Sequence, residues 1–215
     1  MRFKSREYAA QLLIERLSPC CGNQNPLVLG VPRGAVPMAG IMAEALAGEL
    51  DVILVRKLSH PEQPEFAIGA VDESGNAFLA EWAADVDPQF VEAEKQRQLA
   101  LLRGRRARYT PWREPIDPND RIVIVVDDGI ATGSTMTAAL RTVRAKKPKK
   151  LIGAVAVASL DAARAMVHEC DVMVCLNVAA EFFAVGQFFE DFTQVSEQDV
   201  IAALRKSNAS APAVA

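Results

Sequence analysis

The chain has 215 residues, of which 50% are hydrophobic and 24% are charged, and its formal net charge is -3. This length predicts one α/β domain with an appendage, and the negative charge argues against general nucleic-acid binding. No apolar run is long enough for a membrane span, and the polar residues 1–6 are unlike a signal peptide. The four cysteines lack a metal-binding spacing, so we interpret them as reduced thiols of a cytoplasmic protein.

Helical and strand patterns alternate along the chain. Helices are predicted over residues 5–17, 36–46, 88–108, from 134 onward, 162–167 and 196–204. Strands are predicted over residues 27–31, 52–55, 67–71, in a hairpin within 72–80, and over 123–126, 151–157 and 172–176. This order indicates an α/β sheet with right-handed crossovers.

Two carboxylates and a turn of small residues follow the apolar strand 123–126. Asp127 and Asp128 come first, then Gly129 to Thr135, with a helix pattern beginning near Ser134. Free backbone N–H groups and partial positive charge at a helix start favour a phosphate, to which the turn's hydroxyls add donors. The carboxylates suit sugar hydroxyls or the water shell of Mg²⁺. The alternative is an ordinary turn in which Asp128 caps the helix.

A second turn of the same kind follows the strand 27–31. It carries Arg33 and Gly34, and a helix of small apolar residues begins after it. The arginine side chain has a fork of donors that fits a phosphate. The alternative is a solvated loop charge.

The run from Asp127 to Thr135 closely resembles the phosphoribosyl pyrophosphate (PRPP) motif of type I phosphoribosyltransferases. Segments 32–34, 56–58 and 67–71 are similar to the bacterial subgroup known as putative phosphoribosyltransferases. The resemblance implies a parallel sheet flanked by helices with a small hood, and transfer of ribose 5-phosphate from Mg²⁺-bound PRPP to a nitrogenous base with release of pyrophosphate. It implies PRPP and a base as partners and a homodimer, with neither membrane nor nucleic acid expected. The alternative is a non-catalytic regulator that senses PRPP or a nucleotide.

The expected organisation is a single domain over residues 1–206. Its core covers about 27–176 and carries a helical insertion over about 81–118. The N-terminal helix and residues 177–206 form the hood, and 207–215 are expected to be a disordered tail.

By position, the resemblance gives a role to each candidate site residue. The 5-phosphate site comprises Gly129, Ile130, Ala131, Thr132, Gly133, Ser134 and Thr135. The pyrophosphate site comprises Arg33, Gly34, Arg56 and Lys57. The catalytic residues are Asp127, Asp128, Lys57 and His60, the base-binding residues are Phe183 and Val185, and the Mg²⁺ ligands are Asp127, Asp128 and Asp191.

The sequence departs from the family pattern at several positions. In 6-oxopurine enzymes an Asp at the place of Ala131 accepts a proton, so hypoxanthine and guanine are disfavoured. The loop 58–66 resembles the family's mobile loop but keeps His60 alone, and Glu190 occupies the offset expected for Asp191. The basic segment 97–113 is interpreted as a solvated face, a cover over the site or an inter-subunit contact; a nucleic-acid patch ranks last.

Overall fold

The computed structural model describes residues 1–21, 23–63 and 66–210. Five parallel strands form the central sheet in the order β2-β1-β6-β7-β8. Their bounds are β1 Leu27–Gly30, β2 Glu49–Val52, β6 Ile122–Ile130, β7 Lys150–Ser159 and β8 Val172–Ala179. All neighbouring strands in this sheet are parallel and helices alternate with them along the chain, which confirms the α/β class expected from the alternating patterns.

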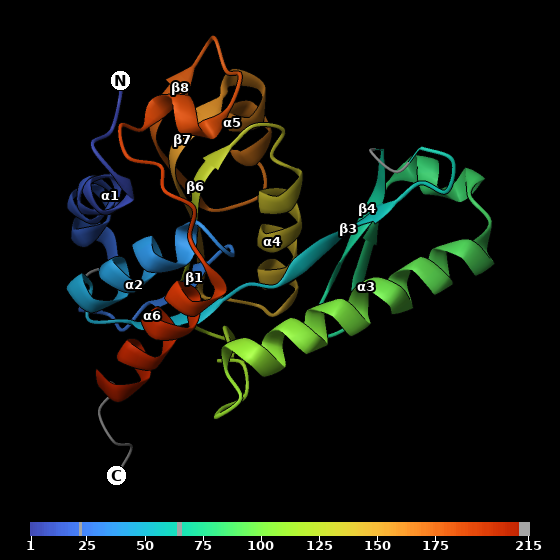
Figure 1. The fold of residues 1–215 in the computed structure, drawn as a ribbon, viewed down its shortest axis with the longest axis horizontal. Helices are drawn as coiled ribbons and strands as arrows, with labels where there is room; N and C mark the ends of the chain where they lie inside the picture. The colour runs from blue at the N-terminus through green and yellow to red at the C-terminus, as the bar shows by residue number, and fades with distance from the viewer. Residues whose placement is uncertain (22, 64–65, 211–215) are drawn as a thin grey trace.

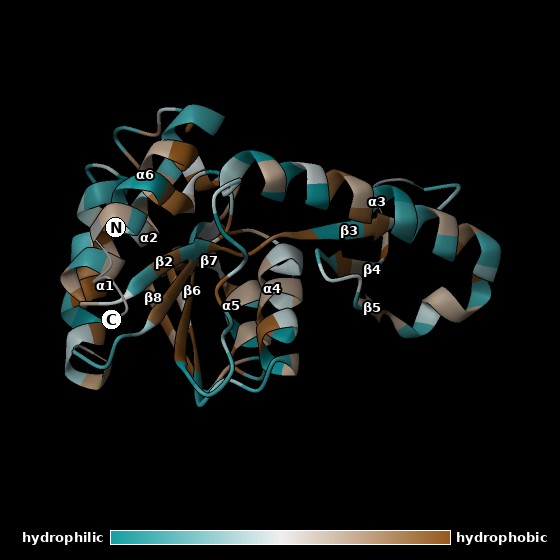
Figure 2. Cartoon of the chain, turned by 90° about the horizontal axis from the view of Figure 1, so that it is seen from below, coloured by the Kyte–Doolittle hydropathy of each residue, from teal (hydrophilic) through white to brown (hydrophobic). Residues whose placement is uncertain are grey.

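Helices cover both faces of this sheet, as Figure 1 shows for α1 and α2 on one side and α4 on the other. The helices are α1 Arg6–Cys21, α2 Ala35–Ala45, α4 Ser134–Ala145, α5 Leu160–Met166 and α6 Glu197–Ser210. Alternate strand residues point to opposite faces of the sheet and pack into two cores. Val28 and Ile124 pack with α1, α2 and α6, whereas Leu27 and Val123 pack with α4 and α5. Burial on both faces explains why the strands read as unbroken apolar runs, which are brown in Figure 2.

A long projection leaves the core after β2. It consists of an antiparallel sheet, β3 Val55–Ser59, β4 Ala67–Asp72 and β5 Ala77–Leu79, the 3-10 helix η1 Glu81–Asp85, and helix α3 Pro88–Tyr109. Figure 1 shows α3 lying along this sheet and returning from the far end of the projection to the core. The projection therefore begins at Val55, and the expected insertion over about 81–118 contains only its second half.

The single strand expected over residues 52–55 is wrong. Val52 ends β2 in the parallel sheet and Val55 begins β3 in the projection, so the chain passes from one sheet to the other here. Ile53 and Leu54 between them are buried. Their burial explains why four consecutive apolar residues looked like one strand.

The hood is formed by residues after β8 together with the start of the chain. Phe3 pairs with Phe189 in an isolated parallel bridge, and their rings lie 5.4 Å apart. The 3-10 helix η2 Val185–Phe188 lies within this segment. These contacts join the start of the chain to the segment after β8.

The final helix is longer than expected. α6 continues to Ser210, so the tail expected over 207–215 is wrong for its first four residues, and 211–215 lie outside the described residues. Arg205 and Lys206 favour a helix, and residues 207–210 contain no Gly or Pro that would end the helix. In the part of the chain that the structure describes, no helix is both long and apolar enough to cross a membrane.

Candidate functional site

The carboxyl ends of the adjacent strands β1 and β6 each lead into a helix whose N-terminus lacks a side-chain cap. Gly34 precedes α2 and Gly133 precedes α4, and neither glycine can supply a capping oxygen. By contrast, Asp87 caps α3 and Ser159 caps α5. The two uncapped helix starts leave backbone N–H groups at the same edge of the sheet, where each can bind an anion.

The turn before α4 is shorter than the sequence indicates. Strand β6 continues through Gly129 and Ile130, which pair with Val157 and Ala158 of β7. Only residues 131–133 form the turn. A Cβ at residue 129 would lie 2.5 Å from Val185 Cγ1. Glycine is therefore needed here because Val185 packs closely on the backbone of β6, and not because of the turn.

Conformation and exposure in this turn suit a phosphate. Gly133 has a φ of 81°, which favours glycine. The Ser159 hydroxyl donates to the Ala131 carbonyl at 2.6 Å and fixes the turn from β7. Thr132, Ser134 and Thr135 are exposed, so their hydroxyls can reach a bound anion.

Asp127 and Asp128 lie inside β6, immediately before this turn. Asp128 N–H donates to Asp127 Oδ1 at 2.9 Å. Burial among the strands, together with the charge of Asp128, raises the pKa of Asp127 well above its usual value. Two like charges held together in this way favour a ligand that brings positive charge or hydroxyl donors.

Arg6 belongs to the site, although no sequence pattern indicated it. Its Nε donates to Asp128 Oδ2 at 2.8 Å, and the two side chains are 10% and 13% exposed. Its Nη1 donates to the Thr193 carbonyl at 2.7 Å, and its guanidinium carbon lies 3.8 Å from the centre of the Phe192 ring. These partners are far from Arg6 along the chain, so local spacing carries no signal of them.

A cavity of about 320 Å³ brings these groups together with the turn after β1. It is lined by Arg6, Arg33, Gly34, Asp128, Phe192, Gln194 and Val195. A Cβ at residue 34 would clash with Asp128 Oδ2. The structure thus brings the predicted residues Arg33, Gly34 and Asp128 into one cavity, and the Pro32–Arg33 peptide bond at its edge is cis.

The other predicted cations lie in the projection. Arg56 and Lys57 are in β3, where Arg56 Nε donates to Gln98 of α3. Because β3 leads away from the parallel sheet (Figure 1), its carboxyl end lies away from the phosphate turns within one chain. His60 follows that end, accepts from the Glu62 N–H at 3.2 Å and lies edge-on to Phe66. Part of the loop 58–66, residues 64 and 65, lies outside the described residues.

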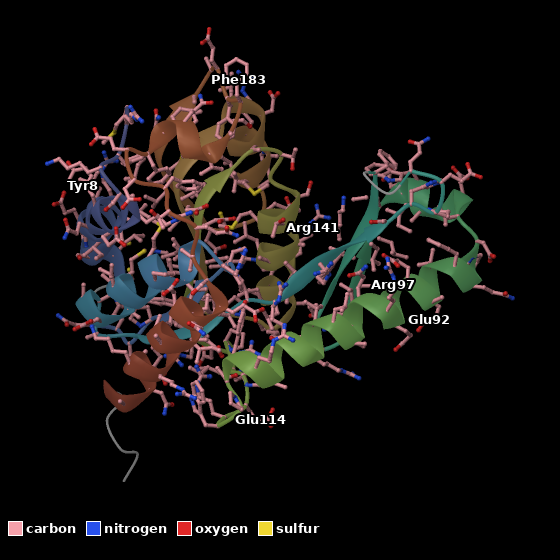
Figure 3. All side chains as sticks on the ribbon, in the orientation of Figure 1. Tyr8, Glu92, Arg97, Glu114, Arg141 and Phe183 are labelled. Carbon is pink, nitrogen blue, oxygen red and sulfur yellow. The ribbon has the colours of Figure 1, made fainter. Side chains whose placement is uncertain are left out.

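The predicted base-binding residues differ in placement. Val185 packs on Gly129, as described above, and so lies next to the phosphate turn. Phe183 is 86% exposed, and Figure 3 shows it at the outer edge of the molecule. Within the described chain Phe183 does not join the cavity.

The acidic side chains near the site do not form a metal cluster. Across residues 1–21, 23–63 and 66–210, no three His, Cys, Asp or Glu side chains gather as a metal group. Asp191 therefore does not form a cluster with Asp127 and Asp128; it accepts from Thr193 N–H and Oγ1 at 3.0 and 2.7 Å. Two adjacent carboxylates fit a Mg²⁺ ion that keeps its waters and is held mainly by substrate phosphates.

Four of the six arginines in the basic segment 97–113 form ion pairs with acids of the chain. Its ion pairs are Arg97–Glu94, Arg106–Asp51, Arg106–Glu73, Arg108–Glu197 and Arg113–Asp51. Those of Asp51 tie α3 and the segment after it to β2. Burial raises the pKa of Tyr109 at the end of α3, against the lowering effect of nearby arginines. A larger hollow of about 780 Å³ beside this segment has neither phosphate turn nor the Asp pair.

Comparison with known proteins gives a consistent family. Residues 3–190 match the phosphoribosyl transferase domain family. The protein named "Putative phosphoribosyl transferase Rv0571c" of Mycobacterium tuberculosis is 39% identical over 209 residues, which are 96% of this chain and 47% of the relative. The chain thus spans about half the length of the curated relatives it matches. The crystal structure of TT1426 from Thermus thermophilus has a TM-score of 0.87 and 43% identity, covering 96% of this chain and 99% of that chain.

Proposed function

The chain belongs to the phosphoribosyl transferase domain family, and from that premise we propose that it transfers ribose 5-phosphate from Mg²⁺-bound PRPP to a nitrogenous base, releasing pyrophosphate. PRPP carries a phosphate at one end of the ribose and a diphosphate at the other. A site for it needs two anion-binding regions with groups for the ribose hydroxyls between them.

The observation that carries the proposal is the pair of uncapped helix starts at neighbouring strands. Gly133 to Thr135 at α4 would hold the 5-phosphate, and Arg33 with Gly34 at α2 would hold the diphosphate. Asp127 and Asp128 lie in β6 between the two turns and would accept the ribose hydroxyls. This spacing matches the order of groups in PRPP.

In the reaction, the bond from ribose C1 to a diphosphate oxygen breaks, and C1 bonds to a nitrogen of the acceptor. Both electrons of the broken bond leave with the diphosphate, so C1 gains positive charge in the transition state. Asp127 and Asp128 would stabilise that charge through the ribose, and Arg33 would stabilise the negative charge on the leaving group. Mg²⁺ bound to the diphosphate would neutralise further charge.

Ala131 and Val185, which lie in and beside the phosphate turn, are apolar. Ala131 lies at the exposed turn and has no proton acceptor, and Val185 packs beside Gly129. An acceptor nitrogen that loses a proton would therefore pass it to solvent or to the released pyrophosphate. This supports a base with an unprotonated or acidic ring nitrogen.

The test is pyrophosphate release from Mg²⁺-PRPP, measured against a panel of purine and pyrimidine bases. We expect release with at least one base, and loss of it in Asp128→Ala. This variant should still fold, because Asp128 lines a cavity rather than a packed core. Asp85→Asn is the matched control, since Asp85 is an exposed acid in η1. No release with any base would argue against transfer.

The alternative is a non-catalytic regulator that senses PRPP or a nucleotide on the same fold. Such a sensor would bind PRPP without releasing pyrophosphate for any base, so the release assay separates it from the transferase. Nucleic-acid binding through the basic segment 97–113 is disfavoured, because Arg97, Arg106, Arg108 and Arg113 are paired with acids of the chain. Paired arginines are poorly placed to neutralise phosphates of a nucleic acid.

A further inference from the structure

The cationic side chain of Arg6, in the first turn of α1, lies at the edge of the phosphate site. Leu13 and Leu17 are fully buried and anchor α1 in the core. The Arg6 guanidinium is held by Asp128, by the Thr193 carbonyl and by the Phe192 ring. Immobilising a guanidinium at a site, rather than leaving it in solvent, prepares it to bind an anion with little further ordering.

The charges around the cavity are unbalanced. Arg6 and Arg33 both line it, but among the described residues that line it Asp128 is the one carboxylate. Arg6 Nη2 lies 3.2 Å from the position that a Cβ at residue 34 would take, so the guanidinium reaches the turn that would hold the diphosphate. An anion in the cavity would meet both cations.

We infer that Arg6 is a second binding residue for the diphosphate, and that it exchanges Asp128 for a diphosphate oxygen when the substrate enters. This inference rests on the proposed function. The Oδ2 atom of Asp128 accepts from Arg6 in the ligand-free chain, and a ribose hydroxyl needs the same kind of acceptor. After the exchange, Arg6 binds a diphosphate oxygen, and Asp128 accepts a hydrogen bond from a ribose hydroxyl.

The experiment measures three ligands by titration calorimetry in the presence of Mg²⁺: PRPP, pyrophosphate and ribose 5-phosphate. Arg6→Ala should weaken PRPP and pyrophosphate by about tenfold or more, the loss expected for a charged hydrogen bond. Ribose 5-phosphate, which lacks the diphosphate, should bind within about twofold of wild type. Arg6→Lys should restore part of the loss because it keeps the charge without the fork of donors.

Controls separate binding from folding. Arg16→Ala removes an exposed arginine from the same helix and should change none of the three affinities. Arg6→Gln keeps most of the side-chain length and replaces Arg6→Ala if circular dichroism shows that the alanine variant is unfolded.

Three results would overturn the inference. Weaker binding of PRPP and ribose 5-phosphate with unchanged pyrophosphate affinity in Arg6→Ala would show that Arg6 only positions Asp128 for the sugar. Unchanged PRPP and pyrophosphate affinity would show that Arg6 does not contact the diphosphate, while the proposed function would stand. Failure of the wild-type protein to bind PRPP would contradict the proposed function as well.

Discussion

Gly34 and Asp128 are so close that the structure has no room for a side chain at residue 34. A Cβ there would clash with Asp128 Oδ2 and lie 3.2 Å from Arg6 Nη2. Gly34 has a φ of -55°, so alanine would suit its backbone, and the contact with Asp128 is the reason for glycine. The turn after β1 and the carboxylate in β6 therefore constrain each other.

Gly34→Ala should push Asp128 off Arg6 and abolish PRPP binding while the chain still folds. We expect the free energy of unfolding to fall by about 1–3 kcal/mol, as is typical of overpacking. Thermal unfolding and calorimetry with Mg²⁺-PRPP measure the two effects. Gly104→Ala is the control: a Cβ there meets nothing within 4 Å in α3, so it should stabilise the helix by about 0.5–1 kcal/mol. Wild-type PRPP affinity in Gly34→Ala would contradict the site geometry.

Asp127→Asn should stabilise the folded protein at neutral pH. Burial and the Asp128 charge raise the pKa of Asp127 in the folded state above the value of about 3.9 in an unfolded chain. The ionised carboxylate then costs stability, and this cost grows as pH rises from about 4 through the raised pKa. Asparagine can still accept from the Asp128 N–H.

Melting temperatures of wild type and Asp127→Asn from about pH 4 to about pH 8 measure this effect. The variant should melt higher at about pH 7, and the difference should shrink toward about pH 4. A variant that is equally or less stable throughout would contradict the raised pKa.

Asp51 should stabilise the junction between the core and the projection. Burial alone would raise its pKa, but Arg106 and Arg113 outweigh burial and lower it. Asp51→Asn should therefore cost about 3–5 kcal/mol at about pH 7, as for a broken buried ion pair. The contribution is present above an unfolded pKa of about 3.9 and is lost as pH falls through the lower folded pKa. Chemical denaturation at several pH values measures it, with Asp85→Asn as the exposed control; equal stabilities at neutral pH would contradict it.

His60→Ala should leave PRPP binding and pyrophosphate release within about twofold of wild type. His60 contacts Glu62 and Phe66 in the projection, and β3 carries it away from the phosphate turns. Steady-state kinetics measures the effect. A large loss of turnover would show that the projection closes on its own site or on that of a second copy.

The site around β6 was predictable because its signals are local. An apolar run, two acids, small residues and a helix pattern follow one another between residues 123 and 135. The passage of the chain between two sheets was not predictable, since Val52 to Val55 is a continuous apolar run whether it forms one strand or joins two. Only the pairing of Val52 with Gly30 and of Val55 with Asp72 separates the two cases.

Contacts between distant parts of the chain account for the other differences. Arg6 reads as an ordinary polar residue of an amphipathic helix, and its partners Asp128 and Thr193 are apparent only after folding. The arginines of 97–113 read as a free basic face because Asp51 and Glu73 lie far away in sequence. Side-chain pairing of this kind depends on tertiary structure and leaves no periodic pattern.

The most direct test of the proposed function is calorimetric titration of the wild-type protein and Asp128→Ala with Mg²⁺-PRPP. We predict saturable binding with a stoichiometry near one PRPP per chain in the wild type, and its loss in Asp128→Ala. Thermal unfolding of both proteins checks that the variant is folded. No binding by the wild-type protein at millimolar PRPP would contradict the proposed function.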